Sequence, residues 1–560
     1  MIRPPALKQP DRIKLLVAII VFSWMTFLIF FRLGHYALWD DEAICALFGK
    51  TLFKTGDTSA LLGQNIIAFN DGRELDDLRQ RYVPPLQFYI VAPFAGLTHD
   101  SAFAVRFPFA LCGLAIVALI LYGLWAAKAS LNTWLLVSAG FMGNVSFILF
   151  SRQCRYYAPM MLFTFLLGYL YLNKAKGRKK IGIMAAVAIM LLASHYLAYI
   201  AVIVCGIVHY LIWGKKERPF SGQEKIIFAV TQLLGGGGIL AIYNPLGKNV
   251  WDYSSRSWFT ERLLLFWWNL RDLNACEMGA GLLIAVAPLV YFLKKDRRLI
   301  EAPLMIFTYI LTIAIFSPQP VEQMSVAFVR YLCPLIPLCI LTAVFVIQAI
   351  SAKIPWLACP LALLFFMTNI MHGGPLFQYP DGTSFSQVIR KAPRRSTILE
   401  FWRELAARRK GPYRMAADWI NANVREGESI LTVPGYTVYP LIFHAPHAVY
   451  AWQLAGDESG RQFQNLPDIH FRNRCLPDYI VAFGPSVIEV AGLLDAPNAW
   501  GVRYDTVGHL DVYWSDLIRP ELFWHSFLPV RDYDPGTESV FIYRKRSSEE
   551  APVTTDYPGN

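Results

Sequence analysis

The chain has 560 residues, of which 55% are hydrophobic and only 17% are charged, a composition far from that of a soluble globular protein. Its net charge of +11 could suit nucleic acid, but lysine and arginine stand in short clusters between apolar runs, as orientation in a membrane requires. Composition therefore excludes nucleic acid as a partner and predicts a polytopic membrane protein. The nine cysteines contain no C-x-x-C pair, so they indicate neither a disulfide framework nor a zinc site.

The first apolar run, roughly 13–33, follows Arg3, Lys8, Arg12 and Lys14 and lacks a small-residue cleavage site. It is typical of a signal anchor, which predicts a cytoplasmic N-terminus. Further apolar runs that could cross a bilayer, several of them short, follow at 102–126, 131–150, 156–172, 181–194, 196–213, 226–243, 278–293, 301–316, 332–350 and 355–371.

The apolar segment 84–97 could also be a span, and the distribution of positive charge decides against it. If it crossed the bilayer, the basic clusters at 174–180, 215–218 and 294–298 would lie outside, whereas otherwise they join the N-terminus in the cytoplasm. Two leading prolines and a short length also favour an interfacial helix. We therefore expect a polytopic α-helical membrane protein with about eleven transmembrane helices in residues 1–371, its polar chemistry gathered at the outer face.

After residue 371 the composition becomes that of a soluble domain. We interpret 372–412 as a linker or a surface arm, 413–546 as an extracytoplasmic α/β domain and 547–560 as a polar tail. Apolar periodicity predicts helices at 413–424, 436–444 and 486–494 and strands at 429–433, 448–452, 479–483, 500–506 and 540–544.

The predicted outer loop, 35–101, carries three consecutive carboxylates, Asp40, Asp41 and Glu42. Neighbouring carboxylates repel one another, which suits one of them to accept a proton as a general base. The alternative is a solvated loop in which Asp40 or Asp41 caps a helix starting at Ala43. The three could also hold a divalent ion, but we expect no obligatory metal, because a monophosphate leaving group that faces arginines has less need of one.

Several arginines are predicted to share the face of these carboxylates. A single arginine at a helix end often only extends to the membrane surface. A group of guanidiniums beside a carboxylate, however, suits a lipid phosphate leaving group, since arginine binds phosphate oxygens bidentately. This combination indicates sugar transfer from a lipid-linked phosphate. The arginines are Arg106, Arg152, Arg155, Arg330 and Arg256, the last in an aromatic loop with Trp251 and Trp258.

Several segments of the chain, over roughly 14–350, resemble GT-C glycosyltransferases, particularly the bacterial aminoarabinose transferase and protein O-mannosyltransferase types. They are LWDDEAICALFGKTLFKTGD, VPPLQFY, AVRFPFALCGLAIVALILYGL, SFILFSRQCRYYAPMMLFTFLLGYLYL, SHYLAYIAVIV and RYLCPLIPL. The resemblance implies inverting transfer from a polyprenyl-phosphate sugar to a hydroxyl acceptor (glycolipid, polysaccharide or protein) at the outer face of a bacterial inner membrane. It also implies that the acidic stretch and the Pro-Pro-Leu stretch each begin an interfacial helix.

The resemblance assigns roles by position. It makes Asp41 the expected base with Glu42 as its partner, and Asp40 an extra neighbour that tunes the pair. Related sequences usually place Lys or His directly before Pro-Pro-Leu, where this chain has Val83, so Arg81 is the candidate replacement. The expected phosphate-binding residues are Arg106, Arg256, Arg81, Arg155, Arg330 and Tyr331, and the candidate substrate contacts are Tyr82, Tyr156, His195, Trp251 and Trp258.

Three alternatives stay open at this level. His195 stands at a helix end, where a structural role is the common one. The chain could be a transporter or flippase, although transporters place ionisable residues near the bilayer midplane and contain paired halves, and no second half repeats the first here. It could also be a receptor or an assembly scaffold whose C-terminal domain does the binding.

Overall fold

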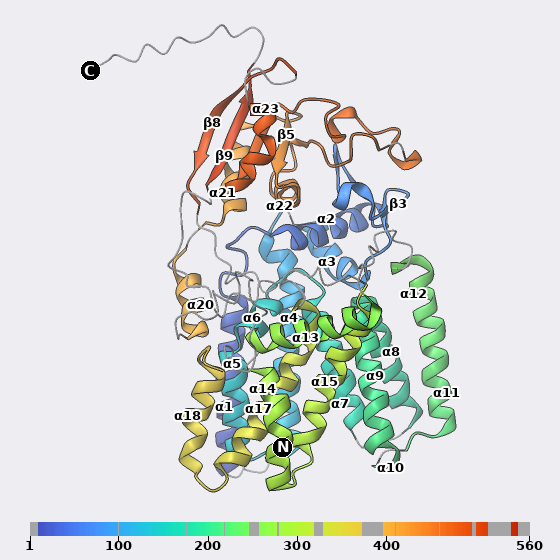
Figure 1. Ribbon diagram of the computed structural model, residues 1–560, viewed down its shortest axis with the longest axis vertical. Coiled ribbons are helices and arrows are strands. Elements are labelled where there is room, and N and C mark those ends of the chain that lie inside the picture. The colour runs from blue at the N-terminus through green and yellow to red at the C-terminus, as the bar shows by residue number, and fades with distance from the viewer. Residues whose placement is uncertain are drawn as a thin grey trace, which may run out of the picture.

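The structure, a computed structural model, is a bundle of helices that carries at one end the loop following the first helix and, beyond it, an α/β domain (Figure 1). It describes residues 9–98, 100–173, 177–217, 219–245, 257–276, 279–318, 329–371, 396–408, 410–458, 460–494, 500–512 and 539–546. The predicted fold class, a helical membrane bundle with an additional α/β domain, is confirmed.

Six helical segments among the described residues are long and apolar enough to cross a membrane. Two further helices meet at 63° and make a seventh span if counted together, α5 (Leu131–Gly143) and α6 (Val145–Ser151). The chain is therefore an integral membrane protein. The six segments lie in α1 (Gln9–Phe30), α4 (Ala102–Ala126), α9 with α10 (Tyr196–His209, Lys215–Glu217), α11 with α12 (Gly222–Thr231, Gly237–Ile242), α15 (Arg298–Phe316) and α16 with α17 (Val329–Leu332, Ile336–Ser351).

The remaining predicted spans are also helical, but they are too short to qualify as crossings by length alone. The count of crossings beyond six or seven therefore stays a prediction. These shorter helices are α7 (Tyr157–Leu172), α8 (Arg178–Ser194), α14 (Ala280–Lys294) and α18 (Ala358–Phe366).

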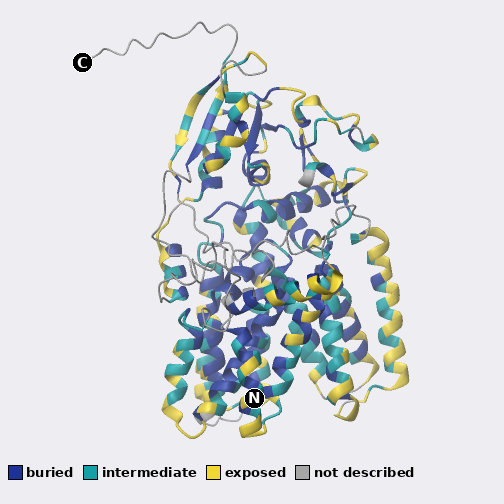
Figure 2. Ribbon diagram, viewed as in Figure 1, coloured by how far each residue is buried: buried dark blue, intermediate teal, exposed yellow. Residues whose placement is uncertain are grey.

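Described residues of the basic clusters at 215–218 and 294–298 lie together at one end of the bundle. At the end far from the α/β domain, Arg297 pairs with Glu217 and Glu301, and Arg178 donates to the side chain of Gln223 (2.9 Å). The sides of the bundle are apolar: Figure 2 shows exposed residues along α11 and α12, where Leu233 and Leu234 are more than two-thirds exposed. Such side chains suit contact with lipid.

The outer loop forms two helices that lie across the end of the bundle (Figure 1), α2 (Asp40–Thr55) and α3 (Leu86–Leu97). Two small hairpins connect them, β1–β2 (Leu61–Leu62, Asn65–Ile66) and β3–β4 (Leu75–Asp76, Arg79–Gln80). A Cβ on Gly49 would stand 2.3 Å from Cγ1 of Val91, so the close approach of α2 and α3 depends on that glycine. The predicted pair of interfacial helices is present, but α2 begins at Asp40, so all three acids lie in its first turn rather than before a helix starting at Ala43.

The C-terminal domain is a five-stranded mixed sheet in the order β6-β5-β7-β9-β8. β5 runs parallel to β6 and β7, while β9 runs antiparallel to β7 and β8. The predicted third helix is largely a 3-10 turn, Gly484–Val490, before the short α23 (Ala491–Leu494). The other elements are β5 (Ser429–Val433), β6 (Val449–Tyr450), β7 (Tyr479–Phe483), β8 (Tyr504–Leu510), β9 (Val540–Lys545), α21 (Pro412–Asn423) and α22 (Val438–His444).

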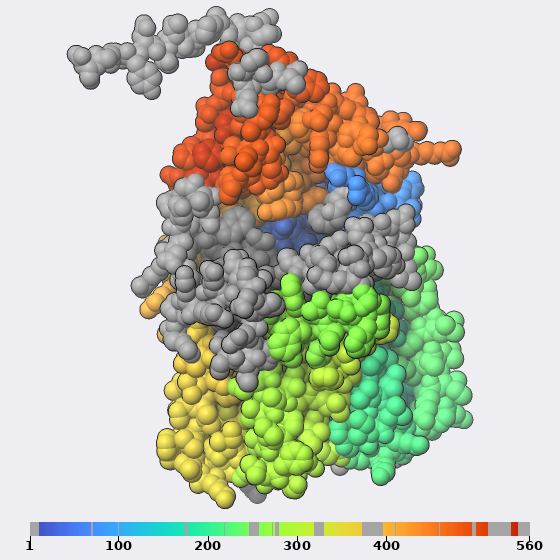
Figure 3. Space-filling view, in the orientation of Figure 1, coloured from blue at the N-terminus to red at the C-terminus, as the bar shows by residue number. Residues whose placement is uncertain are grey.

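The C-terminal domain rests on the outer loop, and the two share one apolar core that includes Phe48, Phe88, Ile430 and Phe443. The Asn65 side chain donates to the carbonyl of Ala448 (2.9 Å) and accepts from the N–H of Tyr450 (2.8 Å). In the space-filling view the two parts form a continuous surface above the bundle (Figure 3). The domain therefore fixes the position of the loop that carries the acids.

Part of the segment interpreted as a linker is a packed helix, α20 (Thr397–Ala406). Its Trp402 lies against the ring of Phe27 in α1 at 5.6 Å and against the ring of Phe31, the residue after α1, at 5.7 Å. Its Glu404 accepts a hydrogen bond from the hydroxyl of Tyr36 at 2.9 Å. This helix consequently ties the entry of the C-terminal domain to the end of the first helix.

Candidate functional site

The first turn of α2 points its three acids in three directions. Successive helical residues are turned by about 100°, so neighbouring side chains do not share a face. Glu42 faces Arg106, Asp41 faces two other arginines, and Asp40 lies near Tyr439 of α22. Burial, together with the charges of Glu74 and Asp40, raises the pKa of Tyr439. The acids do not form one carboxylate cluster, and no group of three potential metal ligands occurs among the described residues.

Glu42 and Arg106 form a buried ion pair that holds the site together. The Glu42 carboxylate is fully buried and accepts from Nε (2.8 Å) and Nη2 (2.5 Å) of Arg106. The remaining N–H groups of Arg106 donate to three backbone carbonyls at 2.9–3.0 Å, those of Leu33, Tyr36 and Ala37. All five donors of Arg106 are therefore used within the chain, which leaves none for the donor phosphate expected from the sequence.

Glu42 also fixes the turn that follows α6. One of its oxygens accepts the backbone N–H of Cys154 at 2.8 Å. In the same turn, Arg152 donates to the carbonyls of Leu28, Ile29 and Phe31 at 2.8–3.0 Å, where α1 ends. These carbonyls have no partner within the helix, so Arg152 caps it. Like Arg106, Arg152 serves the fold.

Asp41 lies between two arginines, Arg155 and Arg330, that pair with this one side chain. Its Oδ1 is 3.1 Å from Nη2 of Arg155 and its Oδ2 is 3.0 Å from Nη1 of Arg330. The three side chains are only partly covered, with exposed fractions of 17% for Asp41, 13% for Arg155 and 21% for Arg330. Burial acts to lower the pKa of Arg155, but Asp41, together with the neighbouring Tyr156, Tyr157 and Cys45, raises that pKa above its usual value.

Neither arginine has all of its N–H donors in hydrogen bonds within the described residues. The Nε groups of Arg155 and Arg330 are buried and have no acceptor among the described residues. Apart from their ion pairs with the Asp41 carboxylate, the guanidiniums make only long hydrogen bonds among the described residues, from Arg155 to the Asp41 carbonyl and from Arg330 to the Tyr331 hydroxyl, both at 3.4 Å. Two cations with spare donors around one accessible carboxylate form a place where an anion can bind.

Three aromatic rings stand behind the two arginines. His195 lies between Tyr156 and Tyr331, with ring centroids 4.8 and 4.9 Å apart. Each arginine lies over the tyrosine that follows it in the sequence, at 5.2 Å in both cases. Tyr156, His195 and Tyr331 thus lie at the predicted site, although both His195 and Tyr156 are buried.

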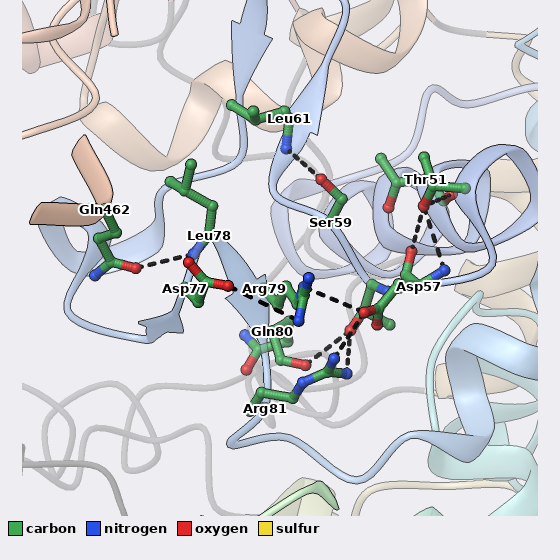
Figure 4. A network of polar contacts seen from close by, with 12 residues as sticks. Thr51, Asp57, Ser59, Leu61, Asp77, Leu78, Arg79, Gln80, Arg81 and Gln462 are labelled. Carbon is green, nitrogen blue, oxygen red and sulfur yellow. Dashed lines mark hydrogen bonds and ion pairs between the residues drawn. The ribbon is translucent and has the colours of Figure 1, made fainter. Parts of the chain in front are cut away.

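Arg81, the candidate replacement for the missing lysine or histidine, belongs to a separate network (Figure 4). It donates to Asp57 (2.7 Å) and to the hydroxyl of Thr58 (3.3 Å) and lies over the ring of Tyr243 at 5.3 Å. Asp57 also pairs with Arg79 at 3.2 Å. Among the described residues, no hydrogen bond or ion pair joins this network to Asp41.

Two further predicted substrate contacts, Trp258 and Tyr82, make their contacts elsewhere in the structure. Trp258, at the start of α13 (Trp258–Cys276), is 61% exposed, and the guanidinium of Arg262 lies over its ring at 5.9 Å from the centroid. The backbone N–H of Tyr82 bonds to the side chain of Gln80 (3.0 Å). Arg256 and Trp251 lie outside the described residues.

Residues 82–235 match the family model for dolichyl-phosphate-mannose-protein mannosyltransferase. The matched segment includes Arg155, Tyr156 and His195 and ends before Arg330. No curated protein matches the chain.

Two solved structures of ArnT from Cupriavidus metallidurans match the chain over most of its length. The one bound to undecaprenyl phosphate is 11% identical, with 96% of this chain and 98% of that chain covered and a TM-score of 0.50. The one in the apo state is 12% identical, with 87% and 95% covered and a TM-score of 0.48.

Proposed function

We propose that the chain is a membrane glycosyltransferase of the GT-C superfamily, which transfers a sugar from a polyprenyl phosphate to an acceptor hydroxyl at the outer face of a bacterial inner membrane. In this proposal Asp41 is the general base, and Arg155 and Arg330 bind the donor phosphate. The observation that carries it is the partly exposed carboxylate of Asp41 held between two arginines with spare donors, at 3.1 and 3.0 Å.

Binding of the donor exchanges one anion for another. The donor phosphate is a diester, and its two non-bridging oxygens compete with the Asp41 carboxylate for the same guanidinium groups and also offer acceptors to the two Nε groups. As the phosphate takes over the arginines, Asp41 loses its partners and is free to accept a proton. Donor binding therefore prepares the base.

The transfer step then uses both parts of the site. Asp41 accepts the proton of the acceptor hydroxyl while that oxygen attacks the anomeric carbon, and the bond from this carbon to the phosphate oxygen breaks on the opposite face, which inverts the centre. The negative charge that grows on the leaving phosphate is stabilised by Arg155 and Arg330. The products are the glycosylated acceptor and polyprenyl phosphate.

The lipid nature of the donor is supported by two findings about other proteins. The matching family model is named for a dolichyl-phosphate-mannose donor, and the similar ArnT structure is bound to undecaprenyl phosphate. The position of the site agrees with such a donor, because α2 lies across the end of an apolar bundle (Figure 1). A lipid tail could stay in the bilayer while its phosphate reaches Arg155 and Arg330.

The test uses membranes that contain the protein and a panel of radiolabelled polyprenyl-phosphate sugars. We expect label transfer by the wild type and loss of transfer for Asp41→Asn. Asp100→Asn is the matched control, because Asp100 is an acid of the same loop that pairs with Lys50 (2.7 Å) away from Asp41. Undiminished transfer by Asp41→Asn would exclude Asp41 as the base, and absence of transfer with every sugar would favour a transporter or a scaffold.

A further inference from the structure

We propose that His195 is a positioning residue that sets the separation of Arg155 and Arg330, so that both reach the same anion. The inference rests on the proposed function, since it assigns the anion as the donor phosphate. It replaces the earlier expectation that His195 contacts substrate.

The two arginines are linked by a continuous series of ring contacts. Arg155 lies over Tyr156 at 5.2 Å, Tyr156 contacts His195 at 4.8 Å, His195 contacts Tyr331 at 4.9 Å, and Arg330 lies over Tyr331 at 5.2 Å. The series is nearly symmetric about His195. Its two halves come from the turn between α6 and α7 and from α16, segments that are far apart in the sequence.

The backbone of His195 is fixed at the junction of α8 and α9. Its N–H donates to the carbonyl of Leu191 (2.8 Å), and its carbonyl accepts from the N–H of Tyr199 (3.0 Å). Its Nδ1 accepts the N–H of Ala198 (3.2 Å), which caps the start of α9. Three bonds to two helices hold this ring in place, so it can serve as a fixed spacer for the tyrosines on either side.

The cap also determines the charge of the ring. Because Nδ1 accepts a hydrogen bond, it carries no proton, and the ring is the neutral tautomer with its proton on Nε2. An imidazolium between Tyr156 and Tyr331 would add positive charge beside Arg155 and Arg330. A neutral, flat ring supplies separation without competing for the phosphate.

Loss of the ring should therefore disturb the arginines as well as the local packing. His195 and Tyr156 are buried, and a protein interior closes partly around a deleted ring. Movement of either tyrosine carries its neighbouring arginine with it. A guanidinium displaced from its place loses a charged hydrogen bond to the phosphate.

Two substitutions separate the ring from the cap. His195→Phe keeps a flat ring and removes the Nδ1 acceptor, whereas His195→Asn keeps a side-chain acceptor suited to a helix N-cap and removes the ring. For each variant we would measure the unfolding temperature, the affinity for undecaprenyl phosphate, and KM and kcat with a polyprenyl-phosphate sugar that the wild type uses.

We expect His195→Asn, which leaves a cavity in place of the ring, to unfold at a lower temperature than the wild type and to bind undecaprenyl phosphate about tenfold more weakly, the effect of losing one hydrogen bond to a charged group, with KM for the donor raised more than kcat is lowered. We expect His195→Phe to unfold at a lower temperature and to retain the wild-type affinity. Any other ranking of the two affinities overturns the spacer role, including equal weakening. Failure of the wild type itself to bind undecaprenyl phosphate would instead overturn the proposed function.

Discussion

If the donor phosphate displaces Asp41 from its two arginines, replacement of Asp41 should change the affinity for the donor lipid as well as catalysis. In the wild type, an incoming phosphate must break two ion pairs, Arg155 to Asp41 and Arg330 to Asp41. Asp41→Asn has nearly the same size but no charge, so this competitor is removed. The variant should therefore lose catalysis and yet bind polyprenyl phosphate more tightly than the wild type.

The expected gain in affinity of Asp41→Asn for polyprenyl phosphate follows from the exposure of the two ion pairs. Ion pairs at the surface contribute about 0–1 kcal/mol each, and buried charged hydrogen bonds contribute ~1.5–3 kcal/mol. The three side chains are 13–21% exposed, so we take about 0.5–1 kcal/mol for each pair. Two pairs then give about 1–2 kcal/mol, which corresponds to roughly fivefold to thirtyfold tighter binding.

The assay measures binding apart from turnover. Wild type, Asp41→Asn and the control Asp100→Asn are reconstituted in lipid nanodiscs, and the affinity for undecaprenyl phosphate is determined by fluorescence titration. A double-mutant cycle with Arg155→Gln then tests whether the gain passes through that arginine, in which case the gain should shrink in the double variant.

Two results would refute the reasoning. If Asp41→Asn binds undecaprenyl phosphate with the affinity of the wild type or more weakly, the phosphate does not compete with Asp41 for the arginines. If Asp100→Asn shows the same gain, the effect comes from the net charge of the loop and not from the ion pairs of Asp41.

Three further predictions concern stability, pH and metal. Arg106→Gln should destabilise the protein by ~3–5 kcal/mol, because the buried carboxylate of Glu42 loses its partner; thermal unfolding measures this, and a variant that is stable but impaired in donor binding would contradict the structural role. Burial, with the charge of Arg414 beside it, lowers the pKa of His444 to about 3, and its Nε2 accepts from the N–H of Leu38 (3.1 Å). Since the folded pKa lies below the usual 6.5, the stability that neutral His444 contributes is complete above pH 6.5 and declines as the pH falls toward 3, by up to ~1.4 kcal/mol per pH unit; the protection factor of the Leu38 amide, which corrects the exchange rate for its intrinsic pH dependence, should fall on acidification in the wild type but not in His444→Gln. Chelators such as EDTA should leave transfer intact, and loss that Mg²⁺ restores would contradict the absence of an obligatory metal.

The sequence predicted most of the elements that position the site. The strands 429–433 and 479–483 are found with the predicted bounds, because fully apolar β-rich runs between turn residues leave few alternatives. The interfacial helix α3 was predicted from its length, its prolines and the basic clusters. The predicted start of α2, Ala43, is three residues too late, because acids are favoured both as caps and in the first turn.

The sequence could not predict which arginine meets which carboxylate. The family resemblance predicts a phosphate contact for Arg106, and Arg155 belongs to the predicted face of the acids. The role of each arginine, however, depends on where distant helices end. Arg106 finds three carbonyls of the segment after α1, and Arg330 reaches Asp41 from α16. One local signal was available, the repeated Arg-Tyr pairs at 155–156 and 330–331, and its meaning appears only when His195 joins them.

The partners of the four arginines divide them into two kinds. Arg106 and Arg152 are held largely by backbone carbonyls, which cannot leave without unfolding a helix end, so neither can be recruited by a ligand. Arg155 and Arg330 are held by one side chain in the first turn of α2, which a rotation about its own bonds can withdraw. The first kind therefore fixes the site during folding, and the second remains open to exchange with a phosphate. Of these four described arginines, Arg155 and Arg330 are therefore the two that the proposed exchange with a phosphate can use.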